Sequence, residues 1–124
     1  MAGIKGFASP ARSYEGNQLS LDQLVIEKPH ATIFCEASGD GMAGAGILNG
    51  SVLIIERGFR ERHGDLVLAV VDGEHLVRRV DEMNQLLVAE PLPGDETGYP
   101  AVGLGRSGEV VIEGVVIGCL NRYR

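Results

Sequence analysis

Residues 66–80, LVLAVVDGEHLVRRV, are the part of the chain that decides its fold. The stretch begins with a continuous apolar run, 66–71, and the pair Asp72-Gly73 follows at once. An Asp-Gly pair between two β-forming runs is typical of a type I′ turn, whose two central residues both need positive φ. The stretch therefore predicts a β-hairpin with strands at 66–71 and 74–80.

Shorter β-forming runs lie on both sides of this hairpin. The chain has 18 glycines, which favour many turns and short strands over long helices. We expect further strands at 31–37, 52–55, 85–90, 110–112 and 115–117, with Gly114 as a β-bulge. The predicted fold class is all-β: a curled sheet of short strands with at most a turn or two of helix.

The first part of the chain differs from the rest. Residues 1–19 show little periodicity and are expected to form a flexible N-terminal arm. Residues 20–124 are expected to form a single β domain, which begins with a capping-box turn at 20–23. A chain of 124 residues is the size of one domain.

Composition excludes several classes of function. The net charge of −6 argues against a protein that grips a nucleic-acid backbone by itself, so any contact with DNA should be indirect. No apolar run approaches the ~20 residues of a membrane span, and no signal-peptide pattern opens the chain. We therefore expect a cytoplasmic protein that does not bind membranes.

Neither a metal nor another cofactor is expected. Cys35 and Cys119 lie in apolar, strand-like runs and are interpreted as reduced structural thiols. The cysteines and histidines show no paired ligand spacing of a zinc site. Residues 39–44 formally match the dinucleotide-binding pattern G-x-G-x-x-G, but only seven residues separate Gly44 from the next predicted strand. A parallel crossover needs a dozen or more residues, so that site cannot form.

The motif that points to function is Ser38-Gly39-Asp40-Gly41-Met42. It resembles the nucleophile motif of the LexA/UmuD family of self-cleaving Ser/Lys proteases, which reads S-G-D-S-M or S-G-x-S-M. The second serine is the family's nucleophile, and Gly41 occupies its place here. The family's catalytic lysine lies on a later hairpin, in a context similar to residues 76–80, LVRRV, where Arg78 occupies its place.

The resemblance covers nearly the whole chain. Similar blocks occur in the family's order at 6–11, 22–26, 29–34, 63–67 and 71–74. The block that starts at Gly6 is similar to the segment after the UmuD self-cleavage bond, and Lys5 replaces the small residue or cysteine expected before that bond. Lys5 and Gly6 are therefore interpreted as a vestigial cleavage site, and the chain as UmuD′-like as synthesised. No residues remain for the DNA-binding domain of LexA, so UmuD is the nearer relative.

The substitutions imply that the protease chemistry is absent. Glycine offers no hydroxyl, and arginine keeps its proton where the lysine must accept one. Ser38 is the nearest hydroxyl, but in an extended chain its side chain would lie on the opposite face from residue 41. We expect Arg78 either to reach solvent or to pair with an acid, of which Asp40 is the nearest in sequence.

The resemblance implies an accessory subunit of an error-prone translesion polymerase of the polymerase V type, acting in SOS mutagenesis. Its implied partners are a second copy, a UmuC-type catalytic subunit and the RecA filament. Alternatives are an inactive protomer that regulates self-cleavage of an intact UmuD or LexA-like partner, a hydrolase that uses other residues, and a relic without a partner. The expected dimer interface is the apolar run Val115, Val116, Ile117, Gly118, Cys119 and Leu120, interpreted as an edge strand.

Overall fold

The structure is a computed structural model that describes residues 31–105 and 109–123. Within those residues, seven strands form one antiparallel sheet in the order β1-β2-β7-β3-β4-β5-β6. The elements are β1 (Thr32–Glu36), η2 (Ala43–Ala45, a 3-10 turn), β2 (Val52–Glu56), β3 (Leu66–Val71), β4 (Glu74–Asp81), β5 (Leu86–Val88), η3 (Glu96–Gly98, a 3-10 turn), β6 (Val102–Gly103) and β7 (Val110–Leu120). The predicted all-β class is confirmed. The predicted arm at 1–19 and the turn at 20–23 lie outside the described residues.

The central hairpin forms as the sequence predicts. In β3 and β4, Val71 lies opposite Glu74, and the two residues between them have φ values of 50° at Asp72 and 86° at Gly73. Positive φ at both positions is the signature of the type I′ turn. The predicted strand at 85–90 is shorter than expected, because β5 covers only Leu86–Val88.

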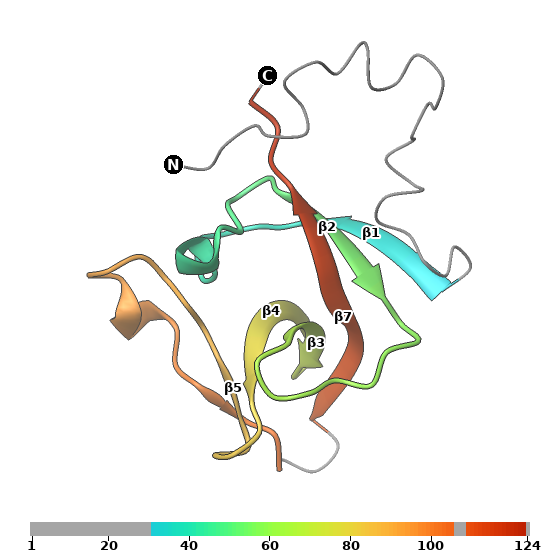
Figure 1. Cartoon of the computed structure of the whole chain (residues 1–124). Coiled ribbons are helices and arrows are strands. Elements are labelled where there is room, and N and C mark those ends of the chain that lie inside the picture. The colour runs from blue at the N-terminus through green and yellow to red at the C-terminus, as the bar shows by residue number, and fades with distance from the viewer. Residues whose placement is uncertain (1–30, 106–108, 124) are drawn as a thin grey trace.

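β3 is buried on both faces, which explains its continuous apolar run. Val67, Ala69 and Val71 belong to one hydrophobic cluster, and Leu68 belongs to another that contains Leu53. Alternate residues of a strand point to opposite faces, so each face of β3 supplies one cluster. The sheet curls, and Figure 1 shows β7 crossing the fold with β1 and β2 on one side and β3, β4 and β5 on the other.

β7 is one long strand where two short ones are predicted. Its pairing with β3 shifts register between Leu68, opposite Gly114, and Ala69, opposite Ile112, which confirms the predicted bulge. A Cβ atom at Gly114 would lie 2.5 Å from Cγ2 of Ile55. Glycine is therefore required where β7 packs closely over β2.

The interpretation of residues 115–120 as an edge strand is wrong for part of the run. Val115 pairs with both Glu56 of β2 and Val67 of β3. The rest of the run pairs with β2 on one side, and its other side has no strand among the described residues. The sequence shows the apolar character of this segment but not its place in the strand order. Its role as a dimer interface stays a prediction.

The segment between β1 and β2 excludes a dinucleotide-binding crossover. β1 and β2 are antiparallel, and η2 spans only three residues. In the described part of the chain, no helix is long and apolar enough to cross a membrane.

Candidate functional site

The bend after β1 is held in place by hydrogen bonds to two other segments. The N–H of Gly39 donates to Oδ1 of Asn49 (2.9 Å), and Gly39 has a φ of 86°. The N–H of Glu90 donates to the carbonyl of Gly41 (2.9 Å), and the N–H of Gly44 donates to the carbonyl of Glu90 (2.7 Å). These bonds fix Gly41 between the end of β1 and the segment that follows β5.

Gly41 and Arg78, the two positions singled out in the sequence, lie in contact. A Cβ atom at Gly41 would be 3.0 Å from Nη1 of Arg78 and 3.2 Å from the ring of Tyr99. Arg78 comes from β4, 37 residues further along the chain, so the contact depends on the tertiary fold. The side chain of Arg78 reaches the space that a side chain at residue 41 would otherwise need.

The surroundings of Arg78 differ from both expected arrangements. Its guanidinium is half-buried, Nη1 donates to the carbonyl of Val77 (2.7 Å), and Cζ lies 5.8 Å from the centre of the Tyr99 ring. The expected pair with Asp40 does not form, and no ion pair among the described residues includes Arg78. Instead, the guanidinium of Arg78 donates a hydrogen bond to a backbone carbonyl and lies over an aromatic ring.

The Nε atom of Arg78 is buried and has no hydrogen-bond partner among the described residues. Burial lowers the pKa of the guanidinium from its ordinary value, and Tyr99 acts in the opposite direction. Removing an N–H group from water without an acceptor costs about 1–3 kcal/mol. Arg78 is therefore a cation with an N–H group, at Nε, that has no acceptor among the described residues.

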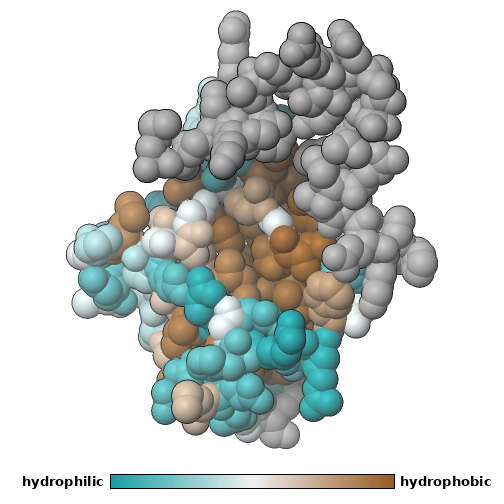
Figure 2. Space-filling view, in the orientation of Figure 1, coloured by the Kyte–Doolittle hydropathy of each residue, from teal (hydrophilic) through white to brown (hydrophobic). Residues whose placement is uncertain are grey.

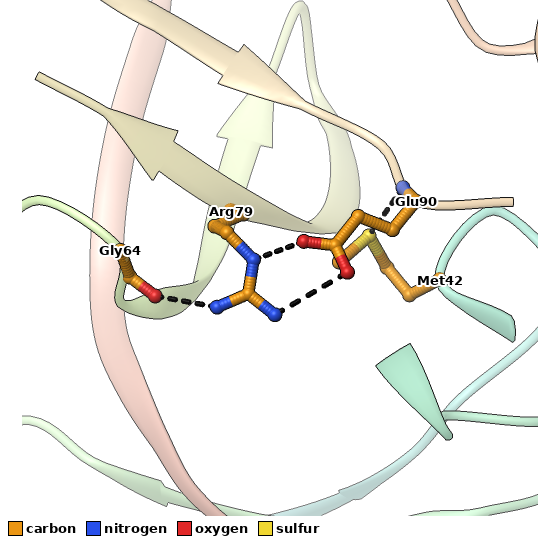
Figure 3. Close-up of polar contacts among 4 residues, drawn as sticks. All are labelled: Met42, Gly64, Arg79 and Glu90. Carbon is orange, nitrogen blue, oxygen red and sulfur yellow. Dashed lines mark hydrogen bonds and ion pairs between the residues drawn. The ribbon is translucent and has the colours of Figure 1, made fainter. Parts of the chain in front are cut away.

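Arg79, the next residue of β4, is fully engaged. It forms an ion pair with Glu90 through Nε and Nη2, and its Nη1 donates to the carbonyl of Gly64 (2.6 Å) (Figure 3). The N–H of Glu90 also lies 3.3 Å from the sulfur of Met42. This side of β4 therefore ties the hairpin to the glycine-rich bend.

An open cleft of about 400 Å³, here called the Arg78 cleft, lies beside Gly41. Its walls are residues 35–39, 41 and 42, residues 75–78 of β4, and Tyr99; Ile47, Leu53 and Leu68 also line it. Figure 2 shows hydrophobic residues gathered at the centre of the face drawn there, with hydrophilic residues toward its lower edge. The cleft is thus mainly apolar, with Arg78 among its few charged groups.

Ser38 lines this cleft together with Gly41, and the extended chain assumed between the two residues does not form. The reason is the positive φ of Gly39, which turns the chain between the two residues. Sequence reasoning also missed Tyr99, Glu90 and Arg79. Tyr99 follows η3 in an irregular segment, and no local pattern connects it with residues 41 or 78.

Two other predictions concern the cleavage site and the cysteines. Lys5 and Gly6, the expected vestigial cleavage site, lie outside the described residues. Cys35 lines the Arg78 cleft, whereas Cys119 is exposed near the end of β7. No group of three His, Cys, Asp or Glu side chains within 31–105 and 109–123 is placed to hold a metal ion.

The chain is similar in sequence to known proteins over most of its length. Residues 2–117 match the family described as Peptidase S24-like. The protein ImpA of Salmonella typhimurium is 37% identical over 122 residues, covering 96% of this chain and 79% of ImpA. The protein SamA of Salmonella typhimurium strain LT2 is 32% identical over 119 residues, covering 96% of this chain and 80% of SamA.

A more distant match is the LexA repressor of Syntrophotalea carbinolica, 32% identical over 87 residues. That match covers 70% of this chain but only 42% of the repressor, so the similarity to ImpA and SamA extends much further. The chain belongs to the Peptidase S24-like family, as a UmuD-like member of the LexA/UmuD group, whose UmuD-like proteins act in mutagenesis after DNA damage.

Proposed function

We propose that this protein is a non-catalytic, UmuD′-like accessory subunit of an error-prone translesion DNA polymerase. In this role it acts in the cytoplasm as a homodimer, together with a UmuC-type catalytic subunit and the RecA filament, in SOS mutagenesis. The observation that carries the proposal is the contact between Gly41 and Arg78. These two residues occupy the places that the resemblance gives to nucleophile and base, and they meet in space.

The chemistry of the pair supports a non-catalytic site. A Ser/Lys dyad needs a hydroxyl that attacks and a neutral amine that accepts its proton. Gly41 has no side chain, and an arginine guanidinium stays protonated in proteins. The space beside residue 41 is already taken by Nη1 of Arg78 and by Tyr99.

The charge of the chain supports the subunit role over direct action on DNA. The net charge is −6, and a protein that binds a nucleic-acid backbone normally presents an excess of positive charge. In the proposed assembly the catalytic subunit and RecA hold the DNA. The surface of this protein then binds protein partners.

Co-expression with UmuC-type subunits, followed by affinity capture through the subunit, tests the proposed role. We expect this chain to be retained as a dimer, in the molar ratio of two copies to one catalytic subunit. A matched capture with intact UmuD-like or LexA-like proteins tests the regulatory alternative. Retention by those proteins together with no retention by any UmuC-type subunit would contradict the proposal.

A further inference from the structure

A second open groove, here called the Arg60 groove, lies between β7 and the loop 57–65 that joins β2 to β3. It has a volume of about 400 Å³ and shares no lining residue with the Arg78 cleft. Figure 1 shows this loop passing across β7 on its way to β3. The walls of the groove are Phe59, Arg60, Arg62 and Asp65 of the loop and residues 115–117 of β7.

Hydrogen bonds hold both ends of this loop in place. At its start, the buried side chain of Glu56 accepts from the N–H of Gly58 through Oε1 (3.0 Å). At its end, Oδ2 of Asp65 accepts from the N–H of Arg62 (2.8 Å), and the N–H of Asp65 donates to the carbonyl of Arg62 (3.0 Å). The groove therefore has a fixed backbone frame, and the carboxylate of Asp65 already accepts a hydrogen bond.

The groove carries positive charge on a protein that is acidic as a whole. Arg60 and Arg62 are exposed, and no ion pair among the described residues includes either side chain. Of the nearby acids, Asp65 accepts from a backbone N–H, and Glu61 does not line the groove. Because the net charge of the chain is −6, the groove is a local site of opposite sign that would attract an acidic ligand.

The remaining walls suit an extended polypeptide. Phe59 is 37% exposed, and Val116 and Ile117 are partly buried, so the groove also offers apolar surface. Beyond Val115, β7 pairs with β2 alone, and its second side has no strand among the described residues. A strand edge of this kind can pair with the backbone of an added peptide. A nucleic acid would use the arginines but not this edge.

We propose that the Arg60 groove binds an acidic, extended segment of a partner protein. The segment lies along the edge of β7, its carboxylates pair with Arg60 and Arg62, and an apolar side chain packs against Phe59. Arginine suits this role, because its planar guanidinium binds a carboxylate through two hydrogen bonds. Residues 118–120, the rest of the predicted dimer interface, do not line the groove and remain available to a second copy. The proposal goes beyond the polymerase role and does not depend on it.

Fluorescence anisotropy with the purified protein tests this directly. The probe is a fluorescein-labelled, C-terminally amidated peptide, Asp-Val-Glu-Val-Asp-Val, compared with its uncharged form, Asn-Val-Gln-Val-Asn-Val. The acidic peptide should bind about tenfold more tightly at low salt, and the difference should shrink as salt screens the exposed charges. Labelled single-stranded DNA of the same net charge should bind more weakly than the acidic peptide.

Variants locate the effect at the groove. Arg60→Gln combined with Arg62→Gln should reduce binding of the acidic peptide to the level of the uncharged one. Arg57→Gln is the matched control, because Arg57 is an exposed residue of the same loop that does not line the groove, and it should leave most of the preference. Arg60→Glu combined with Arg62→Glu should reverse the preference, toward the same peptide with lysine at its acidic positions.

Thermal unfolding of each variant shows that the protein is folded, and light scattering reports its oligomeric state in the same solutions. No binding of the acidic peptide, equal affinity for the acidic and uncharged peptides, or tighter binding of the DNA would overturn the proposal. A preference that survives the paired Gln substitutions would do the same. So would binding to the monomer alone, which would show that a second copy covers the groove. No polymerase subunit or RecA is present, so failure here is separate from failure of the proposed function.

Discussion

Arg78 and Arg79 are neighbours on one strand, yet their surroundings are opposite. Arg79 forms a two-point ion pair with Glu90 and a third bond to the carbonyl of Gly64. Arg78 faces the cleft with one backbone acceptor, a nearby aromatic ring and an unpartnered Nε. One side of β4 is therefore arranged for stability. The other side keeps a cation without an ion pair beside Gly41.

Glu90→Gln should produce the largest change in stability. The substitution removes the charge that pairs with Arg79, which is about one-third exposed. We expect the free energy of unfolding to fall by about 1–2 kcal/mol, more than for a fully exposed pair. Chemical denaturation measures the change, and Glu82→Gln, at an exposed residue, is the matched control. Equal losses of unfolding free energy in the two variants would show that the Arg79–Glu90 pair stabilises the fold no more than an exposed charge does.

Gly41→Ser should depend on the residue at position 78. The new side chain begins 3.0 Å from Nη1 of Arg78 and 3.2 Å from the Tyr99 ring, so it should be less destabilising when Arg78→Lys is also present. We expect a coupling energy of about 1 kcal/mol, typical of residues in contact. Gly98→Ser is the control, since a Cβ atom there meets nothing within 4 Å. Additive effects at residues 41 and 78 would show that the two are not in contact.

Arg78→Met should change stability least among the charge substitutions. It removes one hydrogen bond to Val77 and the contact with the Tyr99 ring, and it also removes the cost of the unpartnered Nε. These contributions oppose each other, so the free energy of unfolding should change by less than about 0.5 kcal/mol. Arg79→Met, measured in the same denaturation series, should be clearly destabilising. If Arg78→Met were the more harmful of the two, Arg78 would be a structural residue.

The two cysteines should differ modestly in reactivity. Burial raises the pKa of the Cys35 thiol, so less of it is thiolate at a given pH, whereas Cys119 is exposed. Because the thiolate is the reactive form, a thiol reagent at pH 8 should modify Cys119 several-fold faster than Cys35. Peptide mass mapping over time distinguishes the two sites, with Cys35→Ser as a reference. Faster modification of Cys35 would contradict the partly buried position of this residue in the cleft.

The sequence was most informative where local chemistry decides structure. The hairpin follows from an apolar run and an Asp-Gly pair, and the bulge follows from Gly114. The strand order could not be predicted, because nothing in residues 115–120 shows that β7 lies between β2 and β3 in the sheet. That failure explains why Val115, which is paired on both sides, was interpreted as part of an edge.

The site was predicted only in part. The family resemblance singled out Gly41 and Arg78, which meet in the structure. Tyr99 and Glu90 could not be predicted, because each contacts β4 or the bend through tertiary packing rather than through a sequence pattern. The predicted ion pair between Arg78 and Asp40 was wrong. Asp40 is next to Gly41 in the sequence, but that position alone does not direct its side chain toward Arg78.

Self-cleavage should be absent from this protein, and its intact mass under activating conditions tests this. The purified protein is incubated with RecA, single-stranded DNA and nucleotide, and its intact mass is followed over time. An intact UmuD-like protein in a parallel reaction shows that the conditions support cleavage. We predict a single unchanged mass, for the protein and for Ser38→Ala alike. A specific fragment that forms in the protein and disappears in Ser38→Ala would show that the cleft still carries a nucleophile.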